Sequence, residues 1–138
     1  TLQTIGVVIS EDGENWNAPK MVLRPDQKFY PRTNNIKGFS TPAAVLLDDK
    51  VHLFFDIVTD DPFSQIALAH AYSQDGITAW IQDEAPFLLR ENFTWTNNQI
   101  RSPTALDGDD GILLWFAGDD GVDFLGIGQG LCRFQEAK

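Results

Sequence analysis

Short runs of apolar residues alternate with polar, turn-rich segments along the whole chain. The runs are rich in β-branched and aromatic residues and end at Gly, Pro, Asn and Asp, which is typical of strands joined by tight turns. No segment carries the pattern of a long helix. The expected strands are residues 5–9, 21–23, 42–47, 51–58, 66–72, 86–89, 104–106, 112–117 and 126–134.

Two motifs occur twice in this pattern, both with a period of just over sixty residues. A Ser-x-Asp-Gly turn followed by Trp occupies residues 10–16 and returns at 73–80. A segment that ends in Pro, at residues 40–42, returns at 101–103. Each is followed by an apolar second strand, Leu-Phe-Phe in one case and Leu-Trp-Phe in the other. A repeat of this length in a β-patterned chain predicts four-stranded units that stack on one another, as in a β-propeller.

The repeat also predicts how the chain is divided. We expect a single propeller segment in which residues 1–37 form outer strands of a first blade and a crossing, 38–90 a complete blade, and 91–138 most of a further blade. Since propellers typically close with about 4–8 blades, the fold class expected is an all-β, incomplete propeller. It would be completed by oligomerisation or by sequence outside these residues.

The Ser-x-Asp-Gly turns have a structural explanation. We expect each Asp to accept backbone N–H groups, each Gly to adopt a positive φ, and each Trp to pack back onto its blade. The residues concerned are Asp12, Gly13, Trp16, Asp75, Gly76 and Trp80.

Composition excludes several classes of function. The formal net charge of −10 opposes binding to a nucleic acid backbone, which needs clustered Lys and Arg. No window approaches the ~20 apolar residues of a membrane span, so no membrane partner is expected. A single cysteine, Cys132, permits no internal disulfide and leaves the compartment open. No metal or cofactor is expected, because the acidic residues near 107–110 and 119–123 do not match a calcium-binding loop and fit solvated turns.

The repeated Pro-containing strand starts, the Leu-Phe-Phe and Leu-Trp-Phe strands and the Ser-x-Asp-Gly turns resemble five-bladed β-propeller glycosidases of glycoside hydrolase families 43 and 32. The resemblance implies carbohydrate as partner and carboxylates at the axial ends of inner strands. In family 43 a catalytic Asp commonly precedes Pro, whereas here Thr41 precedes Pro42 and Ser102 precedes Pro103. The Glu-Cys pair of family 32 is also missing, since Leu131 precedes the cysteine. Either other blades supply catalysis, or the chain is a non-catalytic relative.

Five polar or aromatic residues are candidates for a sugar site. Asp56 is the candidate catalytic acid, because its repeat counterpart is Ala117 and the fold does not demand it; the alternative is a strand-end carboxylate capping the loop at 59–62. Arg101 offers a fork of hydrogen bonds to hydroxyls or a carboxylate, or else pairs with an acidic residue between 119 and 123. The remaining candidates for substrate binding are Trp95, Ser40 and Ser102, with packing between blades as the alternative for Trp95. The two histidines, His52 and His70, are expected in packing or surface roles.

Three functions stay open at this point: a glycosidase-like segment that contacts carbohydrate, a non-catalytic sugar-binding module, and a structural half-propeller that self-assembles. Unpaired terminal strands are edges prone to pairing. We therefore expect a homo-oligomer in which the N-terminal strands of one copy complete the C-terminal blade of another.

Overall fold

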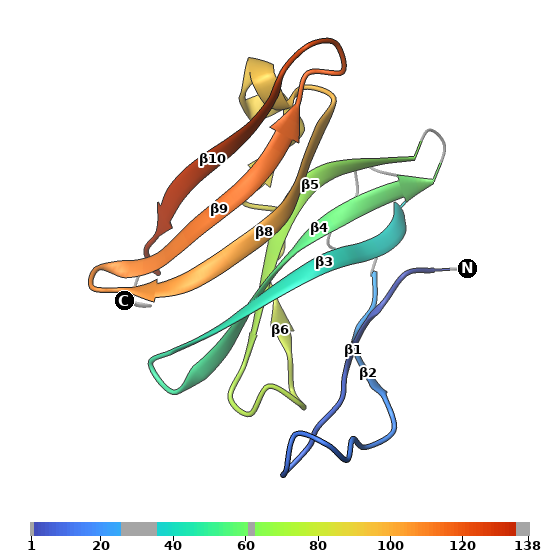
Figure 1. Cartoon of the computed structure of the whole chain (residues 1–138), viewed down its shortest axis with the longest axis vertical. Coiled ribbons are helices and arrows are strands. Elements are labelled where there is room, and N and C mark those ends of the chain that lie inside the picture. The colour runs from blue at the N-terminus through green and yellow to red at the C-terminus, as the bar shows by residue number, and fades with distance from the viewer. Residues whose placement is uncertain (1, 26–35, 61–62, 135–138) are drawn as a thin grey trace.

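The computed structural model describes residues 2–25, 36–60 and 63–134, and this part of the chain is all-β with two short 3-10 turns. Figure 1 shows the strands in three antiparallel groups. Their bounds are β1 (Ile5–Val7), β2 (Lys20–Leu23), β3 (Ile36–Leu47), β4 (Lys50–Asp60), β5 (Phe63–Ser73), β6 (Ile81–Gln82), β7 (Leu88–Leu89), β8 (Gln99–Gly108), β9 (Gly111–Asp119) and β10 (Leu125–Cys132), with 3-10 turns at Arg90–Asn92 and Thr94–Thr96.

The sheets follow the predicted order of strands. β1 pairs with β2, the order β3-β4-β5-β6 forms the central sheet, and β8-β9-β10 forms the third. The outer position of the central sheet differs from the prediction, because β6 and β7 both pair with β5 and divide that edge into two short pieces. Most of the crossing expected at residues 24–37 lies outside the described residues.

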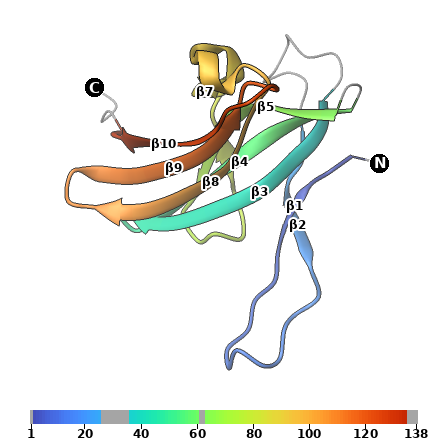
Figure 2. The same cartoon turned by 45° about the horizontal axis from the view of Figure 1, so that its top comes forward.

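The inner strands β3 and β8 lie side by side, as both views show (Figures 1 and 2), so the central and third sheets meet like neighbouring blades. β4 is buried on both faces. Leu53 and Phe55 face a core shared with β1 and β2, whereas Phe54 packs against Ile112 and Leu114 of β9. The apolar run in β4 is therefore explained by burial between two neighbouring sheets.

The inner strands of the two repeats carry the same distortion. The register shifts between Ser40 and Ala43 in β3 and between Arg101 and Thr104 in β8. At each shift the residue before Pro has a left-handed backbone, with φ of 42° at Thr41 and 54° at Ser102. Because Pro lacks an N–H and sits at bulges in sheets, the strand bends here and continues. This is why β3 begins at Ile36, earlier than the predicted residue 42.

The two Ser-x-Asp-Gly turns fold as expected around their carboxylates. Asp12 accepts the N–H groups of residues 14 and 15, and Asp75 accepts those of residues 77 and 78. The side chains of Thr78 and Asn15 donate to the same carboxylates, and together these bonds hold the pKa of Asp75 and of Asp12 well below the usual range. Trp80 packs against the core, but Trp16 is 59% exposed. The expectation that Trp16 packs back was wrong, because its turn projects beyond the two-stranded β1–β2 pair (Figure 2).

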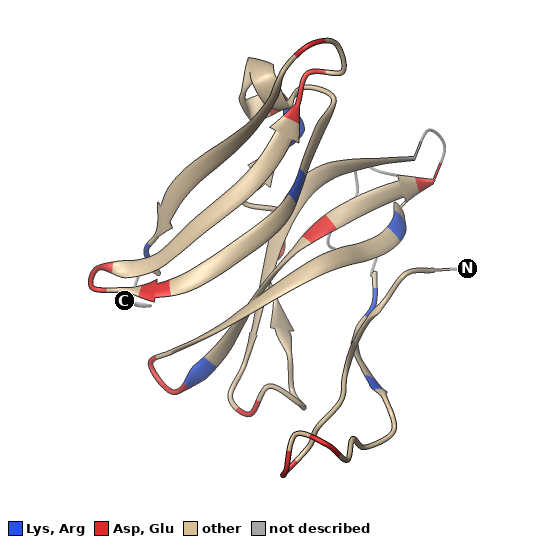
Figure 3. Cartoon of the chain, in the orientation of Figure 1, with Lys and Arg blue, Asp and Glu red and all other residues tan. Residues whose placement is uncertain are grey.

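Acidic residues gather in the turns between strands, as Figure 3 shows for most of the red positions. In those turns their charge is solvated and costs little. A carboxylate inside a strand, in contrast, needs a structural explanation.

Candidate functional site

A buried carboxylate joins the two bulges of the inner strands. Asp56 is fully buried in β4, opposite Ser40 of β3. Its two oxygens accept hydrogen bonds from the hydroxyls of Thr41 and Ser40. The backbone N–H of Ser102, in β8, lies near enough to this carboxyl to lower its pKa. Asp56 therefore connects the two left-handed residues of neighbouring sheets.

Burial raises the pKa of Asp56 to about 6, and the hydrogen bonds from Thr41, Ser40 and Ser102 only partly oppose this shift. The group thus titrates close to neutral pH. The alternative in which this residue caps the loop at 59–62 is wrong, since it lies within β4 and its partners are the bulges.

Arg101 lies one residue before the second bulge, at the position that is equivalent to Ser40 in the repeat. Its side chain lines a hollow of about 430 Å³ at the β9–β10 end of the third sheet. None of the ion pairs among the described residues involves Arg101. The hollow is lined by Asn98, Arg101, Asp119, Gly121, Val122, Asp123, Phe124 and Leu125.

The acidic residues beside the hollow are engaged in holding the β9–β10 turn. Asp119 accepts the side-chain amide of Asn98 at 2.6 Å and the N–H of Gly121 at 3.1 Å. Asp120 accepts the N–H groups of residues 122, 123 and 124, which lower its pKa. These bonds shape the turn without neutralising Arg101. The alternative for Arg101, an ion pair with this acidic segment, is not formed among the described residues.

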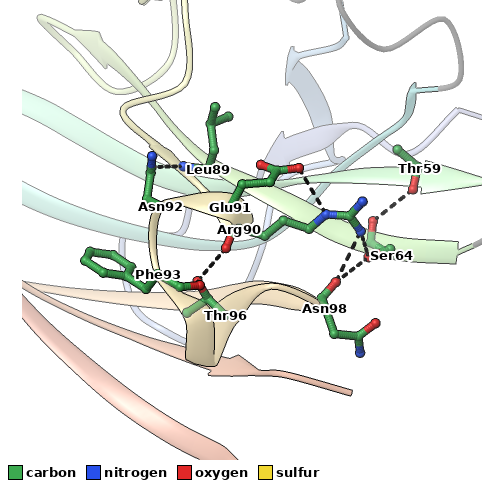
Figure 4. A network of polar contacts seen from close by, with 9 residues as sticks. All are labelled: Thr59, Ser64, Leu89, Arg90, Glu91, Asn92, Phe93, Thr96 and Asn98. Atoms are coloured by element: carbon green, nitrogen blue, oxygen red, sulfur yellow. Dashed lines mark hydrogen bonds and ion pairs between the residues drawn. The ribbon is translucent and has the colours of Figure 1, made fainter. Parts of the chain in front are cut away.

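The connection before β8 is fixed by a network of polar contacts, drawn in Figure 4. Arg90 donates to the hydroxyl of Ser64 at 3.1 Å and to the carbonyl of Asn98 at 3.2 Å. Ser64 itself donates to the same carbonyl at 3.1 Å, and Thr96 closes the 3-10 turn by donating to the carbonyl of Arg90 at 2.6 Å. This network ties the backbone of Asn98, at the edge of the hollow, to the central sheet.

The candidate residues fall into two groups. Ser40, Asp56 and Ser102 come together at the bulges, and Arg101 directly precedes Ser102 in β8. Trp95 lies apart from them. Its ring is stacked on Phe116, with centroids 5.7 Å apart, and meets Phe124 edge-on at 6.0 Å. Trp95 therefore supports Phe124, which lines the hollow.

A second polar cluster escaped the sequence analysis. His52 and His70 lie within hydrogen-bond distance of each other, and His70 contacts Asp83. The contact between the histidines could have been predicted from the alternation of side chains between the two faces of the β4–β5 hairpin. His52 and His70 fall on the same face, at diagonal positions. The Asp83 contact depends on how the chain returns after β6. No group of three or more His, Cys, Asp or Glu side chains in the described ranges is arranged to hold a metal ion.

None of the helical turns in the described part is long and apolar enough to cross a membrane. No protein-family model and no curated protein sequence matches the chain.

Solved structures do resemble it. One is a GH43_1 enzyme from Xanthomonas citri complexed with xylotriose, with a TM-score of 0.58 and 16% identity over 70% of this chain. A second is CoXyl43, a GH43 β-xylosidase/α-arabinofuranosidase from a compost microbial metagenome, with a TM-score of 0.61 and 18% identity over 72%. A third is a glycosyl hydrolase from Bacteroides ovatus, with a TM-score of 0.55 and 18% identity over 70%.

The chain spans about a third or less of these proteins, since it covers 28%, 32% and 29% of their lengths respectively. At this identity the likeness concerns the fold alone. The chain has the fold of part of a GH43-like five-bladed β-propeller, as the repeated motifs predicted.

Proposed function

We propose that this chain is a carbohydrate-binding segment of a glycosidase-like propeller, and that Arg101 is its principal contact to sugar. The observation that carries the proposal is a guanidinium without an ion-pair partner among the described residues, lining a hollow of about 430 Å³ next to the inner-strand bulge. Its five N–H donors suit the paired hydroxyls of a sugar ring. Two of the similar structures were solved with xylotriose, which makes that trisaccharide the first ligand to test.

In this proposal the other candidates act around Arg101. Ser102 is exposed and follows Arg101 directly, and we assign its hydroxyl a contact to the part of the ligand that extends beyond the hollow. Asp56 is buried, and we assign it the role of holding the bulges through its contacts to Ser40, Thr41 and Ser102. The stacking of Trp95 behind Phe124 maintains the wall of the hollow.

The two bulge residues, Thr41 and Ser102, carry hydroxyls that do not ionise at neutral pH. Hydrolysis in this proposal therefore needs carboxylates from elsewhere in the propeller. This chain then supplies binding contacts and other blades supply the acid and the base. The second candidate, a non-catalytic sugar-binding module, is favoured by the same two hydroxyls.

Calorimetric titration with xylotriose tests the proposal. We expect Arg101→Ala to weaken binding roughly tenfold or more, because a hydrogen bond to a charged donor contributes about 1.5–3 kcal/mol. Arg101→Lys should bind with intermediate affinity, since lysine retains the charge but loses the fork. The control is Arg24→Ala, which removes an exposed arginine that does not line the hollow and should leave affinity unchanged. Equal binding by wild type and Arg101→Ala would contradict the assignment.

We further propose that copies of this chain associate, with N-terminal strands of one copy completing the C-terminal blade of another. β10 ends the third sheet, and the side chains of Leu125 and Ile127 are 68% and 78% exposed on it. Such an apolar edge favours pairing.

Light scattering coupled to gel filtration checks this association. A defined oligomer is expected for the wild type and a monomer for Ile127→Lys, since a charge on the edge opposes pairing. A folded wild-type monomer at micromolar concentration would defeat the proposal. Gln129→Lys, on the same face of the same strand, shows whether any added charge has this effect.

A further inference from the structure

Two buried histidines and one carboxylate form a chain of hydrogen bonds across the central sheet. The Nδ1 atom of His52 lies 3.0 Å from Nε2 of His70, and Nδ1 of His70 lies 2.9 Å from Oδ2 of Asp83. The histidines are 6% and 3% exposed, while the side chain of Asp83 is 45% exposed. The chain of bonds thus leads from solvent into the interior.

Hydrogen-bonding rules fix where the protons lie. The carboxylate of Asp83 accepts, so Nδ1 of His70 carries a proton. When His70 is neutral, its Nε2 is an acceptor, and Nδ1 of His52 must then donate to it. One added proton is accommodated, because His70 then donates from both nitrogens and His52 accepts. A second added proton sets two N–H groups against each other across the 3.0 Å contact.

The ring of Phe134 covers both histidines, with its centroid 4.5 Å from that of His52 and 5.0 Å from that of His70. Phe134 follows β10, so it joins the end of the third sheet to the central sheet. Phe54 and Tyr72 complete the aromatic surround. A doubly charged pair beneath these rings has little access to water, which makes that state costly.

Few other charges face the pair. Asp48 lies in the β3–β4 turn, and Lys50, which begins β4, has its Nζ 5.5 Å from the ring centroid of Tyr72. From the chain after β6 comes Asp83, and on the C-terminal side Cys132 and Arg133 immediately precede Phe134.

We propose that His52, His70 and Asp83 form a proton-operated latch that holds the segment containing Phe134 against the central sheet and releases it when both imidazoles are protonated. With one added proton or none, the three side chains form a continuous chain of donors and acceptors, and the segment is held. With two added protons, the N–H groups of His52 and His70 face each other, and the segment is released. The latch is independent of sugar binding, because none of its members lines the hollow beside Arg101. Burial, His70 and Lys50 all lower the pKa of His52, which places the release on the acid side of neutrality.

Nitrogen-detected histidine NMR on the full chain tests the latch. At pH 8 we expect both neutral imidazoles in the Nδ1–H tautomer, whereas free histidine favours Nε2–H. On acidification, the nuclear Overhauser contacts between the Phe134 ring and His52 should disappear in step with the second protonation. His52 in the Nε2–H tautomer at pH 8, or contacts that persist when both rings are doubly protonated, would overturn the proposal.

Variants separate the latch from general acid unfolding. His52→Phe retains an aromatic ring but accepts no proton, so Phe134 should stay docked at acid pH. Asp83→Ala removes the acceptor that holds the Nδ1 proton of His70, so the Nδ1–H tautomers of the two rings at pH 8 should no longer be enforced. Asp48→Ala is the matched control and should leave both tautomers unchanged, because Asp48 makes no hydrogen bond to either ring. An equal change of tautomer in the two Asp variants would contradict the assigned path.

Discussion

Wild-type protein is expected to lose on the order of 3 kcal/mol of unfolding free energy between about pH 4 and pH 6.5 through the titration of Asp56 alone. The pKa of this carboxyl rises from 3.8 to about 6 on folding, and each unit is worth about 1.4 kcal/mol. Between those two values the folded state binds the proton and the unfolded state does not. Stability therefore falls as pH rises through this window and is lowest above it.

The difference between wild type and Asp56→Asn isolates this effect. His52 opposes it, because a lowered imidazole pKa makes stability rise with pH, but that contribution is common to both proteins. Urea unfolding of both proteins at a series of pH values gives the measurement. The control is Asp49→Asn, which removes an exposed carboxylate in the β3–β4 turn. A difference between wild type and Asp56→Asn that does not vary with pH would show that Asp56 is not buried as described.

Phe54→Ala is expected to destabilise the protein by about 3–5 kcal/mol, the usual range for emptying a buried phenylalanine site. Phe54 is 1% exposed and packs against Ile112 and Leu114, so the lost contacts are those between the central and third sheets. The free energy of unfolding falls both because less apolar surface is buried and because the missing ring leaves a cavity. Chemical denaturation of the variant measures the loss.

Phe93→Ala serves as the matched control, since this phenylalanine is 40% exposed on the connection before β8. Its loss should be less than half as large. If both variants lose the same amount, the two sheets do not pack through Phe54, and the description of neighbouring blades fails.

The order of strands was predictable because each apolar run is bounded by turn residues and the whole pattern recurs. Strand lengths were less predictable. A bulge before Pro42 lets β3 continue where proline ordinarily ends pairing, and Thr41 accepts a left-handed backbone because Asp56 holds its hydroxyl. Asp56 lies in β4 and Thr41 in β3, so the pattern of residues around Thr41 does not predict this hydrogen bond.

The sequence could nominate candidate residues for a site. Asp56 was chosen because its counterpart in the other repeat is Ala117, and Arg101 because it begins an inner strand. Their surroundings were not predictable. Whether nearby acids pair with Arg101 depends on the β9–β10 turn, where Asp120 instead accepts backbone N–H groups. The burial of Asp56 depends on two sheets meeting, which requires the tertiary structure.

An NMR titration of the isotope-labelled chain with xylotriose, following the Arg101 side-chain Nε–H signal, tests directly whether Arg101 contacts sugar. We expect this signal to shift saturably, together with backbone signals of Asn98 and of residues 121–125 that line the hollow. The backbone signals of the Ser-x-Asp-Gly turn at 73–80 should stay in place. Saturable shifts at that turn with no change at Arg101 would contradict the assignment of Arg101 as the sugar contact.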